Sequence, residues 1–371
     1  MKKRLLLGIL LAFALLLPAG AYDEGLYQQQ LSAIGGDALR SAAGGQGGAY
    51  LSGLSPSPDA DIGTSLATLV ERTAGENGKA FHAALRSLTR VMMVVVLCGC
   101  AAGFHTAAGG ATPAAINMAG ALGVTAVLLG DMRGLLALCS GTLEQVSVFS
   151  KTMLPVMAAA ISLTGAPTTA TVMQAATMFA FDLLVRFITA VLVPAVCAYI
   201  VLITVNAAMG NDMLERLAAF VKWATTTSLK LILTLFIAYI TISGSLGGSV
   251  DGIAVKAAKF AVSGSVPVVG GIISDAAETM LSGALLLKNT VGIFGMVCIA
   301  AICIVPFFKV GISYLLFKAG SAALSPVCSA SLSKLIGGIS DSFGLLLGML
   351  GTCSAVLFFE LVFSVALVKP A

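Results

Sequence analysis

Charged residues are scarce in this chain, since Asp, Glu, Lys and Arg together make up only 10% of its 371 residues. A soluble domain typically carries about 25%. Hydrophobic residues reach 58%, and the mean hydropathy is +1.00. A surface with so few charges could not keep the chain dispersed in water. We therefore expect an integral membrane protein, and a single bundle of spanning segments in place of several soluble domains.

Residues that perform chemistry are equally sparse. The only histidines, His82 and His105, do not cluster with cysteines in the way that zinc requires. Six of the eight cysteines lie inside apolar runs, where a thiol behaves as a small buried hydrophobe. The segment GENGK at 75–79 lacks the full glycine spacing and the Ser or Thr of a phosphate loop. We expect no catalytic residue, no cofactor and no metal.

The first 21 residues read as a cleavable signal peptide. Lys2, Lys3 and Arg4 precede a short apolar run, and Ala19-Gly20-Ala21 resembles a cleavage site. Removing those three basic residues from the total of 21 leaves 18 against 17 acidic residues, a near-neutral balance that argues against nucleic acid as a partner. Residues 22–64, rich in Gly and Ala, are expected to form a flexible extracytoplasmic segment.

The remaining chain predicts an all-α, polytopic transmembrane helix bundle with six or seven spans and short interfacial helices. Residues 65–90 are expected to form an amphipathic lead helix, and residues 91–371 the membrane domain. Residues 211–223 suggest a further interfacial helix, with Trp223 as a headgroup-level anchor. The apolar segments lie at about 91–109, 113–130, 153–167, 171–193, 194–209, 224–243, 291–308 and 344–368, with shorter pieces at 134–143 and 310–325.

Asp182 and Arg186 stand four residues apart inside an apolar run. Ionisable groups in a membrane helix are costly, and they often mark a functional site. At this spacing the two side chains can neutralise each other on one helix face. The structural interpretation is a self-compensated pair facing the bundle interior, and the functional one is a polar path or a partner contact.

A polar, glycine-punctuated loop at 244–290 interrupts the apolar pattern. Asp275 and Glu278 have the spacing of a helix capping box, which would be a structural role. A transporter would instead use the glycine-rich break to line a cavity at membrane depth. The candidate functional residues in this loop are Lys259, Pro267, Gly270, Gly271, Asp275, Glu278, Lys288 and Asn289.

Residues 257–296 carry a family resemblance. The order AAKF, VPVVGG, SDAAET and LLLKNTVGIFGM resembles the stage III sporulation protein AE family of endospore-forming bacteria. This order does not follow from hydrophobicity alone. The Gly- and Ala-rich residues 22–64 and the many membrane cysteines are departures that match no family feature.

The resemblance implies a role and no reaction. Such a protein would be a non-enzymatic component of a secretion-like channel complex in the mother-cell membrane around the engulfed forespore. Its partners would be other membrane proteins of that complex, including a cytoplasmic ATPase and ring-forming proteins, and the lipid bilayer. An autonomous small-molecule permease, with a midplane site near Asp182 and Arg186, is the alternative. An intramembrane enzyme is disfavoured by the missing catalytic residues.

Overall fold

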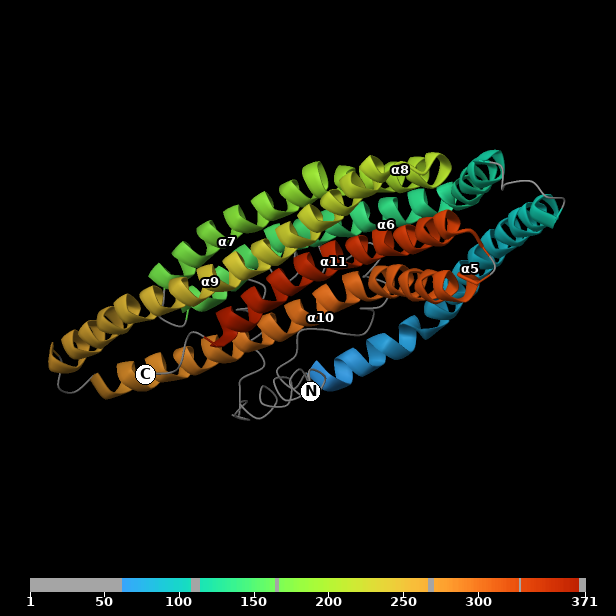
Figure 1. Cartoon of the computed structure of the whole chain (residues 1–371). Helices are drawn as coiled ribbons and strands as arrows, with labels where there is room; N and C mark the ends of the chain where they lie inside the picture. The colour runs from blue at the N-terminus through green and yellow to red at the C-terminus, as the bar shows by residue number, and fades with distance from the viewer. Residues whose placement is uncertain (1–61, 108–113, 164–166, 266–269, 327, 367–371) are drawn as a thin grey trace.

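The computed structural model describes residues 62–107, 114–163, 167–265, 270–326 and 328–366. These residues form long helical rods that run back and forth along one axis, with α7, η1 and α8 continuing as one rod in a single direction (Figure 1). The helices are α5 (Ile62–Ala107), α6 (Ala114–Leu163), α7 (Pro167–Phe187), a π-helical turn η1 (Ile188–Leu192), α8 (Val193–Met209), α9 (Asp212–Ser265), α10 (Gly270–Leu324) and α11 (Ala330–Ala366).

The described part of the chain contains six helical segments that are long and apolar enough to cross a membrane. This agrees with the expected all-helical fold and with six or seven crossings. The signal peptide and the segment at 22–61 lie outside the described residues. The structure does not separate interfacial helices from the spans, because residues 65–90 continue into the apolar part of α5 and residues 212–223 continue into the rest of α9.

Several apolar segments that the sequence suggests as separate pieces are joined into single helices. Residues 134–143 and 153–163 belong with the preceding span in α6, and residues 310–324 continue the central part of α10. Pro155 and Pro306 lie within these helices without ending them. Neighbouring helices allow this, because they shelter the backbone groups that a proline leaves unpaired. Pro194 instead follows the π turn η1, and such local π adjustments help a membrane helix to accommodate the missing N–H.

The central helix of the bundle is α10, which packs against α11, α5 and α6. Its residues from Thr290 to Cys303 are buried on every side, apart from a partly exposed Ala300. A helix that is apolar all round is expected to lie inside a larger assembly of helices. The motif residues Val291 to Met296, which helped to suggest the family resemblance, therefore form the interior of the bundle.

Glycine allows close packing of neighbouring side chains at Gly295. A Cβ atom there would overlap the end of Met153 on α6 and would stand 3.0 Å from Leu361 Cδ1 on α11. Small residues at such crossings let helices approach closely in a membrane protein. The three helices α6, α10 and α11 therefore meet at this level.

Candidate functional site

In the first three turns of α9, polar side chains face the bundle interior. Glu215 and Lys222 line a cavity, whereas Met213, Phe220 and Trp223 are exposed on the opposite side of the same helix. A helix at the surface of a soluble protein has the reverse arrangement. Polar residues of membrane helices typically face the bundle interior or a water-filled cavity.

The connection between α8 and α9 is fixed by local geometry. Gly210 ends α8 in the left-handed conformation, with φ of 65°, and its N–H donates to the Asn206 carbonyl oxygen at 2.7 Å. A glycine in this conformation carries no Cβ penalty. The Asn211 side chain then accepts a hydrogen bond from the N–H of Met213 at 2.9 Å, which starts α9. The tight turn places the polar faces of α8 and α9 side by side.

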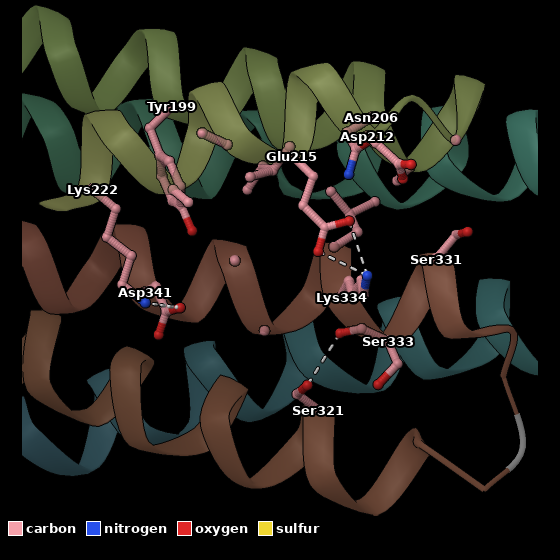
Figure 2. Close-up of a pocket in the computed structure, with 18 residues that line it drawn as sticks. Tyr199, Asn206, Asp212, Glu215, Lys222, Ser321, Ser331, Ser333, Lys334 and Asp341 are labelled. Carbon is pink, nitrogen blue, oxygen red and sulfur yellow. Dashed lines mark hydrogen bonds and ion pairs between the residues drawn. The ribbon is translucent and has the colours of Figure 1, made fainter.

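The cavity lies between α8, α9, α10 and α11 and has a volume of about 590 Å³ (Figure 2). Tyr199 and Asn206 reach it from α8, and Ser321 from α10. Small residues at its middle, including Ala218 and Gly338, leave the space open. The volume falls within the range of small-molecule sites.

Two ion-pair groups cross the cavity. Lys334 of α11 lies 2.8 Å from a carboxylate oxygen of Glu215 on α9. Deeper in the bundle, Asp341 of α11 receives Lys222 of α9 at 2.6 Å and Lys318 of α10 at 3.0 Å, on separate carboxylate oxygens. Figure 2 shows Lys222 and Asp341 directed towards each other. The Asp341 side chain is only 20% exposed, so this carboxylate ties three helices together where water is limited.

The cavity ends at the Asp341 cluster. The next residues of α11 towards its C-terminus, Ser342, Phe343, Leu345 and Leu346, are buried in the core. Phe343 also packs edge-on against Phe317 of α10, with ring centroids 5.5 Å apart. The arrangement can therefore hold water or a small polar group at one end of the bundle, behind which the interior is filled by side chains.

The pairing that the sequence predicts between Asp182 and Arg186 is present, with Arg186 Nε 2.6 Å from Asp182 Oδ2. The expected orientation is wrong, because the Arg186 side chain is 77% exposed and faces away from the interior. Lys151 of α6 also approaches Asp182, at 3.4 Å, so one carboxylate compensates two basic groups. A second, smaller hollow of about 390 Å³ adjoins these three residues.

The structure places the candidate residues of the polar loop on two helices. Lys259 lies on α9, and Gly270, Gly271, Asp275, Glu278, Lys288 and Asn289 lie on α10. Pro267 and the side chains of this group lie outside the described part of the chain. The backbone is helical up to Ser265 and again from Gly270, so helix extends further into 244–290 than its glycines and proline suggest. Asp275 consequently follows the start of α10 and does not cap it.

The sequence interpretation missed the Asp341 cluster. Lys222 and Asp341 are 119 residues apart, and Lys318 reads locally as a charge at the end of a span. The available signal was one acidic residue within the apolar run of α11, the same signal that drew attention to Asp182. The sequence interpretation also missed Glu360, a second acidic residue in the apolar run of α11, which is only 2% exposed inside the bundle.

Comparisons with known proteins identify the family. The family model described as stage III sporulation protein AE matches residues 59–368. One similar protein is the stage III sporulation protein AE of Bacillus subtilis (strain 168), which is 26% identical over 219 residues. That alignment covers 59% of this chain and 55% of the relative, so little more than half of that protein is matched. No solved structure gives a significant match. The match over most of its length and its long apolar helices establish that this chain is a membrane protein of the stage III sporulation protein AE family.

Proposed function

We propose that this protein is a non-enzymatic membrane subunit of the channel complex between mother cell and forespore. The proposal rests on family membership and on the resemblance of residues 257–296. In this role the chain lies in the mother-cell membrane that surrounds the forespore, with its N-terminal segment on the extracytoplasmic side. Its partners are other membrane proteins of the complex, including ring-forming proteins and a cytoplasmic ATPase that supplies energy.

The packed interior of the bundle is the observation that supports a subunit role. The axis of the bundle is filled by α10, whose residues from Thr290 to Cys303 are almost completely buried. Protein interiors packed in this way leave no room for passing solutes. A conduit that uses this protein is therefore formed between copies or with companion proteins, and this chain supplies part of its wall or platform.

The polar cavity favours the second candidate, an autonomous small-molecule permease. Permeases place polar groups and ion pairs in cavities between membrane helices. The cavity beside Glu215, Lys222 and Asp341 has this character, although it is closed on one side by the core. A permease would need a second conformation in which the Asp341 cluster opens.

Deletion of the gene in the source bacterium tests the proposed role. We expect vegetative growth to be normal, and late forespore reporter activity and forespore volume to fall after engulfment. Re-expression of the intact chain should restore both. Normal spores from the deletion strain would overturn the sporulation role.

Co-purification tests the partners independently. A tagged chain isolated from cross-linked, sporulating cells should bring down an ATPase and ring-forming membrane proteins. The same tagged chain produced in vegetative cells serves as the control. Recovery of the chain alone from sporulating cells would contradict the proposal of a complex.

A further inference from the structure

The longest charge-free stretch of the sequence, residues 91–130, forms two legs of a helical hairpin at one end of the bundle. No Asp, Glu, Lys or Arg occurs in this stretch. The described legs are the end of α5, 91–107, and the start of α6, 114–130. In Figure 1 these legs reach beyond the ends of α10 and α11 at the same end of the molecule.

The two legs run antiparallel in a constant register. Ser87 of α5 donates a hydrogen bond to Asp131 of α6 at the base of the hairpin. Further along, a Cβ atom added to Gly123 would lie 3.1 Å from Val94, and one added to Gly120 would lie 3.2 Å from the Cys98 sulfur. Asp131, the first charge after the hairpin, therefore lies at the level of Ser87, and Arg90, the last charge before it, lies within one helical turn of that level.

One exposed stripe of α5 changes from basic to apolar at this level. Its residues follow helical spacing, and they are Arg86, Arg90, Met93, Leu97 and Phe104. Met93, Leu97 and Phe104 are 64%, 66% and 80% exposed. Arg86 and Arg90 are also exposed, and they form no ion pair with any residue that the structure describes. Two unpaired like charges four residues apart destabilise a helix unless an anion lies nearby.

The α6 leg has the same character. Met118, Leu122 and Leu129 are exposed along it, and the leg ends in the charged residues Asp131 and Arg133. At about 1.5 Å per residue each leg is about 25 Å long, which is close to the roughly 30 Å of a bilayer's hydrocarbon core. Below Arg86, by contrast, α5 carries Glu71, Arg72, Glu76 and Lys79.

We propose that the lipid bilayer covers the outer face of this hairpin and that its polar boundary lies at the Ser87–Asp131 level. Arg86 and Arg90 bind the phosphate groups of anionic lipids there, and the stripe from Met93 to Phe104 descends into the hydrocarbon. Of the whole length of α5, only the part after Arg90 is then surrounded by acyl chains. Arginine suits this position because its guanidinium binds phosphate in a bidentate manner.

The single tryptophan makes the depth measurable. In full-length protein carrying Trp223→Phe, either Leu97→Trp or Leu122→Trp is introduced, and the protein is reconstituted in brominated phosphatidylcholine vesicles. These two positions lie at nearly equal distances from the Ser87–Asp131 bond. Both tryptophans should be quenched most by bromine placed deep in the acyl chains, and to a similar extent.

Phe81→Trp in the same background is the matched control, since position 81 is exposed on α5 below Arg86. Its fluorescence should respond to acrylamide in the water and not to deep bromine. The proposal is overturned if the tryptophans introduced at positions 97 and 122 resist bromine, whether acrylamide quenches them or a second copy of the chain shields them.

The arginine contact has its own readout. With Met93→Trp, brominated phosphatidylglycerol should quench more strongly than brominated phosphatidylcholine, with local enrichment of up to about fivefold per arginine. Arg86→Gln with Arg90→Gln should bring the two lipids to equality. Arg72→Gln with Lys79→Gln removes the same charge lower on the same helix and should leave the preference intact. Equal quenching in the unsubstituted arginine background would overturn the phosphate contact.

Discussion

At the scale of single residues, Asp341 holds the most informative position in this molecule. It accepts Lys222 and Lys318 from two other helices while only 20% of its side chain is exposed. Removing one partner of a poorly hydrated ion pair costs more than the pair contributes, because the remaining charge has lost its compensation. The cluster therefore constrains how α9, α10 and α11 meet at the cavity.

Replacing Asp341 by Ala is expected to lower the free energy of unfolding by roughly 2 kcal/mol, between the values for exposed and buried pairs. Lys222→Met should cost less, under about 1 kcal/mol, because Lys318 still compensates Asp341. Thermal unfolding in detergent, followed by circular dichroism, measures both. Lys230→Met, an exposed lysine on the same helix, is the control and should be silent. Equal effects of Asp341→Ala and Lys222→Met would contradict the shared-carboxylate interpretation.

Asp182 compensates two basic groups at the outer surface, so its substitution should behave differently. Asp182→Ala leaves Arg186 and Lys151 uncompensated, whereas Asp182→Ala with Arg186→Ala leaves only Lys151. We expect the single change to be the more harmful, by less than about 1 kcal/mol because Arg186 and Lys151 are exposed. Comparison of the two melting temperatures checks this order. A double variant as unstable as the single one would rule out charge compensation.

At the scale of elements, the meeting point of α6, α10 and α11 depends on Gly295. Gly295→Ala should lower stability by about 1–3 kcal/mol, because the new methyl group meets Met153 and Leu361. Gly141→Ala on α6 is the matched control, since no atom lies within 4 Å of a Cβ there. That change should be neutral or stabilising by up to about 1 kcal/mol, the difference in helix propensity. Denaturation of both variants under one set of conditions decides the point.

A second substitution distinguishes crowding from a general intolerance of change at Gly295. Met153→Ala in the Gly295→Ala background removes the side chain that the new methyl group meets. We expect the double variant to lose less stability than the two single changes added together. Strict additivity would mean that Gly295 and Met153 do not share the same space.

The sequence predicts reliably that the hydrophobic runs are helical. It does not predict which of these runs join into one continuous helix. Residues 91–109 and 291–308 stand out because a charge-free apolar run of this length has few stable alternatives in lipid. The apolar segments around Pro155 and Pro306 read as separate pieces, yet both prolines lie inside continuous helices, α6 and α10. The start of α10 at Gly270, ahead of Asp275, shows that a capping pattern can lie inside a helix.

The candidate site was harder to infer than the fold, because its members come from different helices. The local pair Asp182–Arg186 is visible in the sequence at a spacing of four residues, although its outward orientation depends on how α7 packs. The cluster of Lys222, Lys318 and Asp341 is assembled only when α9, α10 and α11 come together. Lys222 and Lys318 lie 119 and 23 residues from Asp341 in the sequence, so no local pattern joins the three charges.

At the scale of the whole molecule, the helices are longer than a bilayer requires. α10 has 55 residues and is about 80 Å long, against a hydrocarbon core of about 30 Å. A bundle of such helices extends well past the bilayer on at least one side. The part beyond the membrane is available for companion proteins, which agrees with a subunit role in a larger complex.

A packed bundle and a self-contained permease differ in what one chain can do alone. A sporulation defect after deletion would not separate them, since a permease could also be needed for spore formation. The two roles differ in the permeability that they predict for vesicles containing this protein alone. Because the interior around α10 is filled, a subunit role predicts that solutes do not cross through the isolated protein. Sealed vesicles that contain only the purified chain test this prediction in the absence of companion proteins.

The most direct measurement is therefore solute flux through vesicles that contain only this protein, compared with protein-free vesicles and with vesicles carrying the Asp341→Ala variant. We predict that small charged and zwitterionic solutes, including amino acids and phosphate, cross no faster with the intact chain than without protein. Saturable uptake that the Asp341→Ala variant abolishes would contradict the subunit role and establish a transporter.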